Sequence, residues 1–346
     1  MPLLRRKART VTDPVQGTAD FWEWWSSEGA RRTAEAIAAE TLDAWASTIS
    51  EHVDAVHPEL AWELGPGSTS EHVLVVTAEG DPALRSTARR WRRAAPSADA
   101  VWEYSDVRLP AAGLTWSLGL DGETLDAGGV RVGATVHGSA VDVVVHHPAF
   151  ARMPKKAQQQ AMFLMLDNGL GEALVETWVG EVSPSATEPQ GAVDLLELRA
   201  VVAALETEHI DEHGSPTWSV LNGEAHGRPA LAMAQVPLRP MTAPHLDTHV
   251  EVTLRYPDDG ESGMPDAVSL TALRDLEDHL ANRLGDSGRV LAHETSAGSR
   301  RLHVYVDGTT PAVEQVRTAL SAWQGGPPVV AVDLDPAWAA VAHLRG

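Results

Sequence analysis

Residues 246–335 contain an order of apolar patterns that few folds can accommodate, and it constrains the chain more than any other feature. Alternating apolar residues predict strands, and apolar residues at helical spacing predict helices. Gly285 directly follows the first helical pattern, as is typical of a helix end. The predicted elements are a strand over 246–256, a helix over 266–284, strands over 289–295 and 301–307, a helix over 310–323 and a strand over 329–334. This βαββαβ order indicates a ferredoxin-like domain, a fold that hosts many unrelated functions.

The preceding sequence predicts strands and helices in a recurring order. Two stretches each predict a β-hairpin, a helix and a further strand, and residues 289–334 repeat that order a third time. The predicted elements lie at 60–64, 72–77, 81–95 and 101–104 in the first stretch, and at 130–136, 141–146, 155–168 and 176–181 in the second. Repeated β-hairpin–helix–strand modules indicate the α+β class rather than a parallel doubly wound sheet.

Composition shifts suggest the domain limits. Residues 1–17 are polar and basic and are expected to form a flexible tail. An N-terminal α+β domain is expected over 18–236, ending with a helix over 194–209 and a strand over 230–236. Three prolines then predict a linker over 237–245, and the ferredoxin-like domain follows over 246–346.

The densest aromatic segment is Phe21-Trp22-Glu23-Trp24-Trp25. Phe21 and Trp25 are four residues apart, so they share one face of a short helix. Such a cluster is either a platform for a ligand or, as we expect here, an anchor that fixes the helix to the core. Gly29 is expected to end this helix, and a long amphipathic helix is predicted over 31–56.

The composition excludes several classes of function. Twenty-seven basic and 48 acidic residues give a net charge of −21, which disfavours a nucleic-acid partner and would suit a basic protein partner. The chain has no cysteine, which excludes disulfides, a thiolate nucleophile and a zinc–thiolate cluster. No sequence motif implies a cofactor. Without an apolar signal region or a run of about 18 apolar residues, we expect a cytoplasmic protein that does not bind a membrane.

Several short phrases are similar to those of a bacterial family known only as domain of unknown function 695: FWEWW, LAWELGPG, VLVVTAEGD, MLDNGLGEALVETWVGEV and SGMPD. In that family a Trp-rich α+β region precedes a ferredoxin-like domain. Ser262 stands where the family pattern suggests Asn. The resemblance implies a fold and a bacterial origin, and it assigns no catalytic residue. The layout of the C-terminal domain is also similar to that of regulator of ribonuclease E type B proteins, which bind a protein partner.

The segment from His209 to His213 has the H-x-x-E-H spelling of an inverted zincin. Zinc binding would need both rings on one helical turn and a further ligand from elsewhere. Gly214 follows at once, so these histidines are better explained as residues that favour the negative end of a helix. We therefore expect no metal, and His209, His213, His245 and Asp247 are only weak candidates for ligands.

Polar side chains alternate on two strands of the predicted ferredoxin-like domain. His249 and Glu251 lie on the first strand, and His303 and Tyr305 on the third. These strands are neighbours in a βαββαβ sheet, so the four side chains should lie together on the face opposite the helices. The row is a candidate surface for a partner or ligand. It is alternatively a metal site, or a face that is solvated or covered by the N-terminal domain.

These patterns favour a non-enzymatic, cytoplasmic protein-binding or regulatory protein. One alternative is a hydrolase-type enzyme or a metal-binding protein with its site on the polar sheet face. Another is an immunity or antitoxin-type protein, whose acidity would complement a basic toxin.

Overall fold

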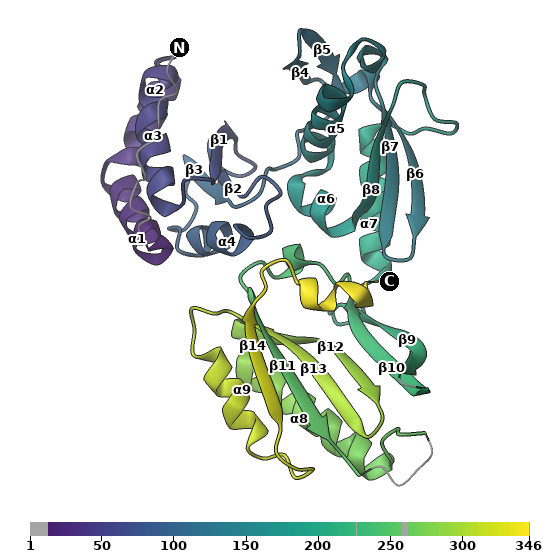
Figure 1. Ribbon diagram of the computed structural model, residues 1–346. Helices are drawn as coiled ribbons and strands as arrows, with labels where there is room; N and C mark the ends of the chain where they lie inside the picture. The colour runs from purple at the N-terminus through teal and green to yellow at the C-terminus, as the bar shows by residue number, and fades with distance from the viewer. Residues whose placement is uncertain (1–12, 226, 258–261, 346) are drawn as a thin grey trace, which may run out of the picture. The chain divides into compact units, whose positions relative to one another are not determined.

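The computed structural model describes residues 13–225, 227–257 and 262–345 (Figure 1). The chain divides into two compact units, residues 1–108 and 109–346. This division falls inside the stretch 18–236, which was expected to form one domain. No Pro- or Gly-rich segment of the sequence marks its position. The helices and strands confirm the α+β class.

The first unit combines four α-helices with a three-stranded sheet among its described residues. The helices are α1 (Pro14–Trp24), α2 (Ala30–Ala38), α3 (Leu42–Val56) and α4 (Arg85–Arg93), and the strands are β1 (Ala61–Pro66), β2 (His72–Thr77) and β3 (Trp102–Ser105). Strand β2 lies in the centre, antiparallel to β1 and parallel to β3.

Two expectations about the first helices were wrong. Gly29 does not end a helix, because a π-helical turn, η1 (Trp25–Gly29), joins α1 to α2 without a break. The long helix expected over 31–56 is instead interrupted after Ala38, where Glu40 adopts a positive φ of 56°. Helix α1 already begins at Pro14, with Asp13 as its N-cap, so residues 14–17 are helical. The rest of the expected tail, residues 1–12, lies outside the described residues.

The aromatic segment is an anchor, as expected. Phe21 and Trp25 are each 1% exposed, and their rings stack at 5.9 Å. The indole nitrogens also have partners: Trp22 Nε1 donates to the carbonyl of Trp91 at 2.8 Å, and Trp25 Nε1 donates to the Tyr104 hydroxyl at 3.1 Å. These bonds satisfy the polar ends of large buried rings, so the cluster ties α1 to α4 and β3.

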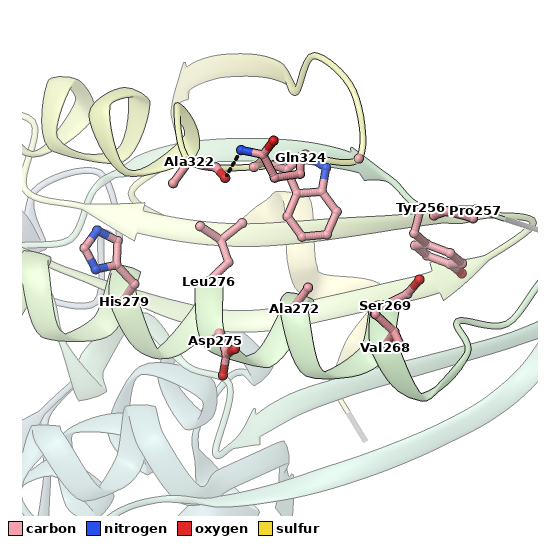
Figure 2. Close-up of a pocket in the computed structure, with 12 residues that line it drawn as sticks. Tyr256, Pro257, Val268, Ser269, Ala272, Asp275, Leu276, His279, Ala322 and Gln324 are labelled. Atoms are coloured by element: carbon pink, nitrogen blue, oxygen red, sulfur yellow. Dashed lines mark hydrogen bonds between the residues drawn. The ribbon is translucent and has the colours of Figure 1, made fainter.

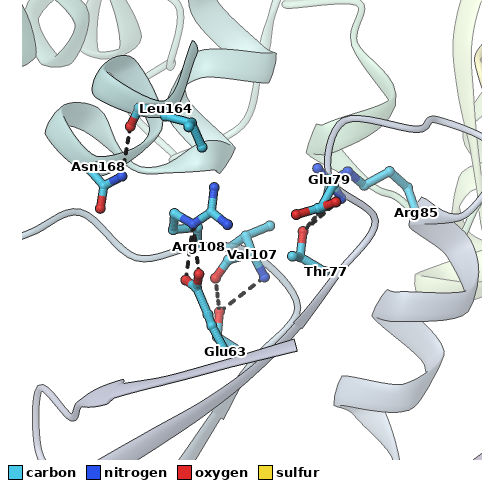
Figure 3. Close-up of polar contacts among 9 residues, drawn as sticks. Glu63, Thr77, Glu79, Arg85, Val107, Arg108, Leu164 and Asn168 are labelled. Carbon is cyan, nitrogen blue, oxygen red and sulfur yellow. Dashed lines mark hydrogen bonds and ion pairs between the residues drawn. The ribbon is translucent and has the colours of Figure 1, made fainter. Parts of the chain in front are cut away.

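Polar contacts fix the C-terminal end of this unit (Figure 3). Arg108 Nε donates to both carboxylate oxygens of Glu63, at 3.1 and 3.0 Å. Arg85 is 2% exposed and donates to Thr77 Oγ1 at 3.2 Å. Arg85, on the arginine-rich helix α4, is therefore a structural residue.

Residues 109–216 repeat the strand arrangement of the first unit, in which a β-hairpin is followed by a helical segment and then by a strand parallel to the second strand of the hairpin. The strands are β4 (Ser117–Leu120), β5 (Glu123–Asp126), β6 (Arg131–His137), β7 (Ala140–His146) and β8 (Val179–Ser185), and the helices are α5 (Lys155–Leu170), α6 (Glu172–Trp178) and α7 (Leu195–Glu208). Strand β7 is antiparallel to β6 and parallel to β8. The strand expected from residue 176 begins later, because Gly171 at φ +89° allows a second helix to start and bury Trp178.

Residues 217–345 form a six-stranded antiparallel sheet. Its strands are β9 (Thr217–Ala225), β10 (Arg228–Val236), β11 (Thr248–Arg255), β12 (Gly288–Ser296), β13 (Ser299–Val306) and β14 (Val329–Leu334), and its helices are α8 (Ala267–Leu284) and α9 (Ala312–Leu320). The order is β14-β11-β13-β12-β10-β9, and the first four strands have the ferredoxin-like arrangement. Leu273, Leu280 and Val316 bring α8 and α9 onto the apolar face of these four strands.

The strand expected to close the preceding domain belongs to this sheet instead. Residues Ala230–Ala234 of β10 pair with β12, and β9 pairs with β10 along its whole length. A ferredoxin-like unit alone would leave β12 as an exposed edge, and the β9–β10 hairpin covers that edge. The third expected module also differs from the other two, since β14 pairs with β11 and not with a strand of the β12–β13 hairpin.

Candidate functional site

The structure brings the predicted polar row together. Strands β11 and β13 are neighbours, with His249 opposite Tyr305 and Glu251 opposite His303. The His249 ring stacks on Tyr305 at 4.8 Å and on His303 at 5.2 Å. The predicted adjacency of these strands is therefore confirmed.

The row is not open to solvent: of the alternatives left by the sequence, a solvated face does not hold for three of its four members. Tyr305 is fully buried, and His303 and His249 are 2% and 5% exposed. The cover is the C-terminal segment of the same domain, where Trp338, Val341 and Leu344 pack with Tyr305 around a 3-10 helix, η6 (Ala339–Leu344). Only the Glu251 side chain remains substantially exposed, at 37%.

Hydrogen bonds join the buried histidines to a carboxylate. His249 Nε2 lies 3.0 Å from His303 Nδ1, and His303 Nε2 lies 3.0 Å from Glu294 Oε1 on β12. With neutral rings, one tautomer arrangement satisfies these hydrogen bonds: His303 Nε2–H donates to Glu294, and His303 Nδ1 accepts a hydrogen bond from His249 Nε2–H. Burial first, and then the neighbouring His303, lower the pKa of His249. The hydrogen bond from His303 lowers the pKa of Glu294 to about 2, so this carboxylate is ionised.

Tyr305 links the sheet to its cover. Its hydroxyl donates to Asp335 Oδ2 at 2.6 Å, and Asp335 also accepts from the backbone N–H groups of Ala339 and Ala340 at 2.8 and 2.9 Å. Asp335 thus accepts hydrogen bonds both from the start of η6 and from the Tyr305 hydroxyl, and so connects η6 to the sheet. Burial, reinforced by Asp335, raises the pKa of Tyr305, so the phenol stays protonated and donating.

Beside the buried row lies an open hollow of about 510 Å³, which we call the sheet-face groove. Its polar lining includes Asn222 and Glu224 from β9, Glu294 and Arg301 from β12 and β13, and His343 from η6. Glu294 lies 3.4 Å from Arg301 Nη1 and 3.5 Å from His343 Nε2, and Arg301 Nε lies 3.5 Å from Glu251. Charges of both signs therefore border the groove.

The weak metal candidates do not converge. His209 ends α7 and stacks on Trp178 at 5.7 Å, whereas the His213 side chain is 79% exposed. His245 Nε2 lies 2.9 Å from the carbonyl of Asp286, and Asp247 accepts from the N–H of Gly308 at 3.3 Å. Within the described part of the chain, no three His, Asp or Glu residues are placed to hold a metal ion.

Sequence reasoning missed Glu294, Arg301, Asp335 and His343, which complete this site. Glu294 and Arg301 are paired residues of the predicted hairpin, so its register gave a usable signal for these two. Asp335 and His343 gave none, because Asp335 lies in the connection after β14 and the six-residue η6, which contains His343, is too short to show a periodic pattern.

No helix among the described residues is long and apolar enough to cross a membrane. Comparisons with curated proteins and with solved structures found no match. The comparison with family models found one match, over residues 217–343, a range that begins at β9 and ends in η6. Its first residue agrees with the six-stranded sheet, in which β9 and β10 belong to the C-terminal domain. Residues 217–343 thus match the model of the family described as "Family of unknown function (DUF695)".

Proposed function

We propose that this protein is a non-enzymatic, cytoplasmic binding protein whose sheet-face groove receives a segment of a protein partner. The observation that carries the proposal is the contrast between the groove and the row beside it. The groove is open and bordered by charges of both signs, whereas the titratable side chains beneath η6 are bonded to one another.

This contrast favours binding over catalysis at the same face. A general acid or base must direct its proton, or its lone pair, at a substrate. Both ring nitrogens of His303 are instead occupied by His249 and Glu294, and the Tyr305 hydroxyl donates to Asp335. Of these bonded side chains only Glu294 lines the groove, and its bond to His303 holds it in place, as a preorganised binding site requires.

The lining of the groove indicates the chemistry of the partner. Glu224 is an exposed carboxylate on β9, and the chain as a whole carries a net charge of −21. Arg301, with a side chain that is 50% exposed, adds a cation at the rim. A partner segment with basic groups, and with a carboxylate or carbonyl positioned at Arg301, would complement these charges.

Affinity purification with quantitative mass spectrometry from the native host tests the proposal. The test variant is Glu224→Lys, which reverses a charge in the groove. The control is Glu314→Lys, which makes the same charge change on α9, where the Glu314 side chain is 69% exposed. We expect a protein that is enriched by the wild type to be lost with Glu224→Lys and retained with Glu314→Lys. Equal retention by both variants would contradict the proposal.

A further inference from the structure

A second hollow lies on the helical side of the C-terminal domain, between α8 and the segment that follows α9 (Figure 2). This α8–α9 groove has a volume of about 460 Å³ and is lined mainly by apolar side chains. Its wall along α8 includes Val268, Ala272, Leu276 and Asp275, and Tyr256 and Trp323 are also in its lining. The sheet-face groove shares none of these residues.

One stripe of α8 faces this groove and is not used by the core. Val268, Ala272, Asp275 and His279 follow helical spacing and are all exposed. Val268 belongs to the apolar pattern that predicted the helix, yet it is 78% exposed, whereas Leu273 and Leu280 of the same pattern are fully buried. At Val268 and Ala272 the stripe therefore presents apolar surface that is exposed to solvent.

The floor of the groove is fixed by hydrogen bonds. Trp323 Nε1 donates to the carbonyl of Arg255 at 3.2 Å, and the Tyr256 hydroxyl donates to the carbonyl of Gly263 at 2.8 Å. Tyr256 is 5% exposed and Leu276 is 6% exposed. A floor held in this way is available to a ligand without rearrangement, which lowers the cost of binding.

The negative charge of the α8–α9 groove favours apolar ligands that also carry a positive charge. Asp275 lines it, and no ion pair or hydrogen bond joins this carboxylate to another described residue. The net charge of −21 adds a general attraction for cations and a repulsion of anions. An apolar group that carries a positive charge at one end therefore complements both the lining and its surroundings.

We propose that the α8–α9 groove binds a segment of a protein partner in which a large apolar side chain lies next to arginine or lysine. The apolar side chain enters between α8 and Trp323 and covers Val268 and Ala272. The basic residue pairs with Asp275. This surface is independent of the sheet-face groove, so it gives the domain a second point of attachment.

Fluorescence anisotropy of labelled peptides with the full-length protein tests this inference. The probe is a fluorescein-labelled peptide containing Leu-Trp-Arg-Arg, and the comparison peptide contains Leu-Trp-Glu-Glu. We expect saturable binding of the basic peptide and none of the acidic one. Asp275→Lys should weaken the binding at least about tenfold, because it replaces the attracting carboxylate with a like charge inside the groove.

Asp278→Lys is the matched control. Asp278 is also exposed on α8 but does not line the groove, so the net charge changes equally in the two variants. We expect Asp278→Lys and the sheet-face variant Glu224→Lys to bind the basic peptide as the wild type does. Equal weakening by Asp275→Lys and Asp278→Lys, equal binding of the two peptides, or no saturable binding would overturn the inference.

Discussion

The replacement His303→Ala tests whether the polar row is an internal support of the C-terminal domain. The imidazole is 2% exposed and bridges His249 and Glu294 through two hydrogen bonds of 3.0 Å. A net hydrogen bond contributes about 0.5–1.5 kcal/mol, and one to a charged group about 1.5–3 kcal/mol. Allowing for partial rehydration of Glu294, whose side chain is 30% exposed, we expect a loss of about 2–4 kcal/mol.

Native-state hydrogen exchange is the suitable assay, because a chain with two compact units need not unfold in one step. The opening free energies of the Val250 and Val304 amides, on β11 and β13, report on this sheet directly. His213→Ala is the control, since that side chain is 79% exposed and should leave these amides unchanged. A loss within about 0.5 kcal/mol for His303→Ala, the range typical of surface sites, would refute the buried network.

Three further predictions concern the same domain. Residues 217–346 should give a well-dispersed amide NMR spectrum and residues 242–346 should not, because β10 covers the edge of β12; equal dispersion would contradict this. Trp338→Ala should cost about 3–5 kcal/mol and speed hydrogen exchange in β13, since its indole is 1% exposed and donates to the carbonyl of Leu246 at 2.8 Å. Burial, and then Arg300, lower the pKa of His293 from 6.5 to about 3. Between these two pH values the unfolded chain binds a proton at His293 and the folded chain does not. The free energy of unfolding therefore falls as the pH decreases from 6.5 towards 3. The drop in melting temperature over that range should therefore be smaller in His293→Gln, and an unchanged drop would count against the assignment.

Much of the ferredoxin-like unit was predictable, because its patterns are long and its connections are short. Helix α8 runs from Ala267 to Leu284 with Gly285 after its end, close to the predicted range 266–284, and Asp266 is its N-cap. The βαββαβ order also predicted that β11 and β13 are neighbours, and the structure places His249 directly opposite Tyr305 on these strands. These are local signals combined with one rule of topology.

The remaining features depend on tertiary contacts that leave no periodic signal. The apolar strand 230–236 carries no information about which sheet edge it joins, so its pairing with β12 could not be read from the sequence. The segment that covers Tyr305 begins at Trp338, which adopts a positive φ of 51° before the short helix η6. For this reason the sequence left open whether the polar row is solvated or covered, and the structure shows that three of its four members are buried.

The proposed protein partner occupies the sheet-face groove. Site-specific photocrosslinking in the native host tests this claim most directly, with a photoreactive amino acid at Asn222, which is exposed and lines the groove. The control position is Arg317, a residue of α9 with a side chain that is 53% exposed and lies outside the groove. We predict a light-dependent adduct with a defined protein from position 222, absent from position 317 and lost when Glu224→Lys is added. The same adducts from both positions, or none from position 222, would contradict the claim.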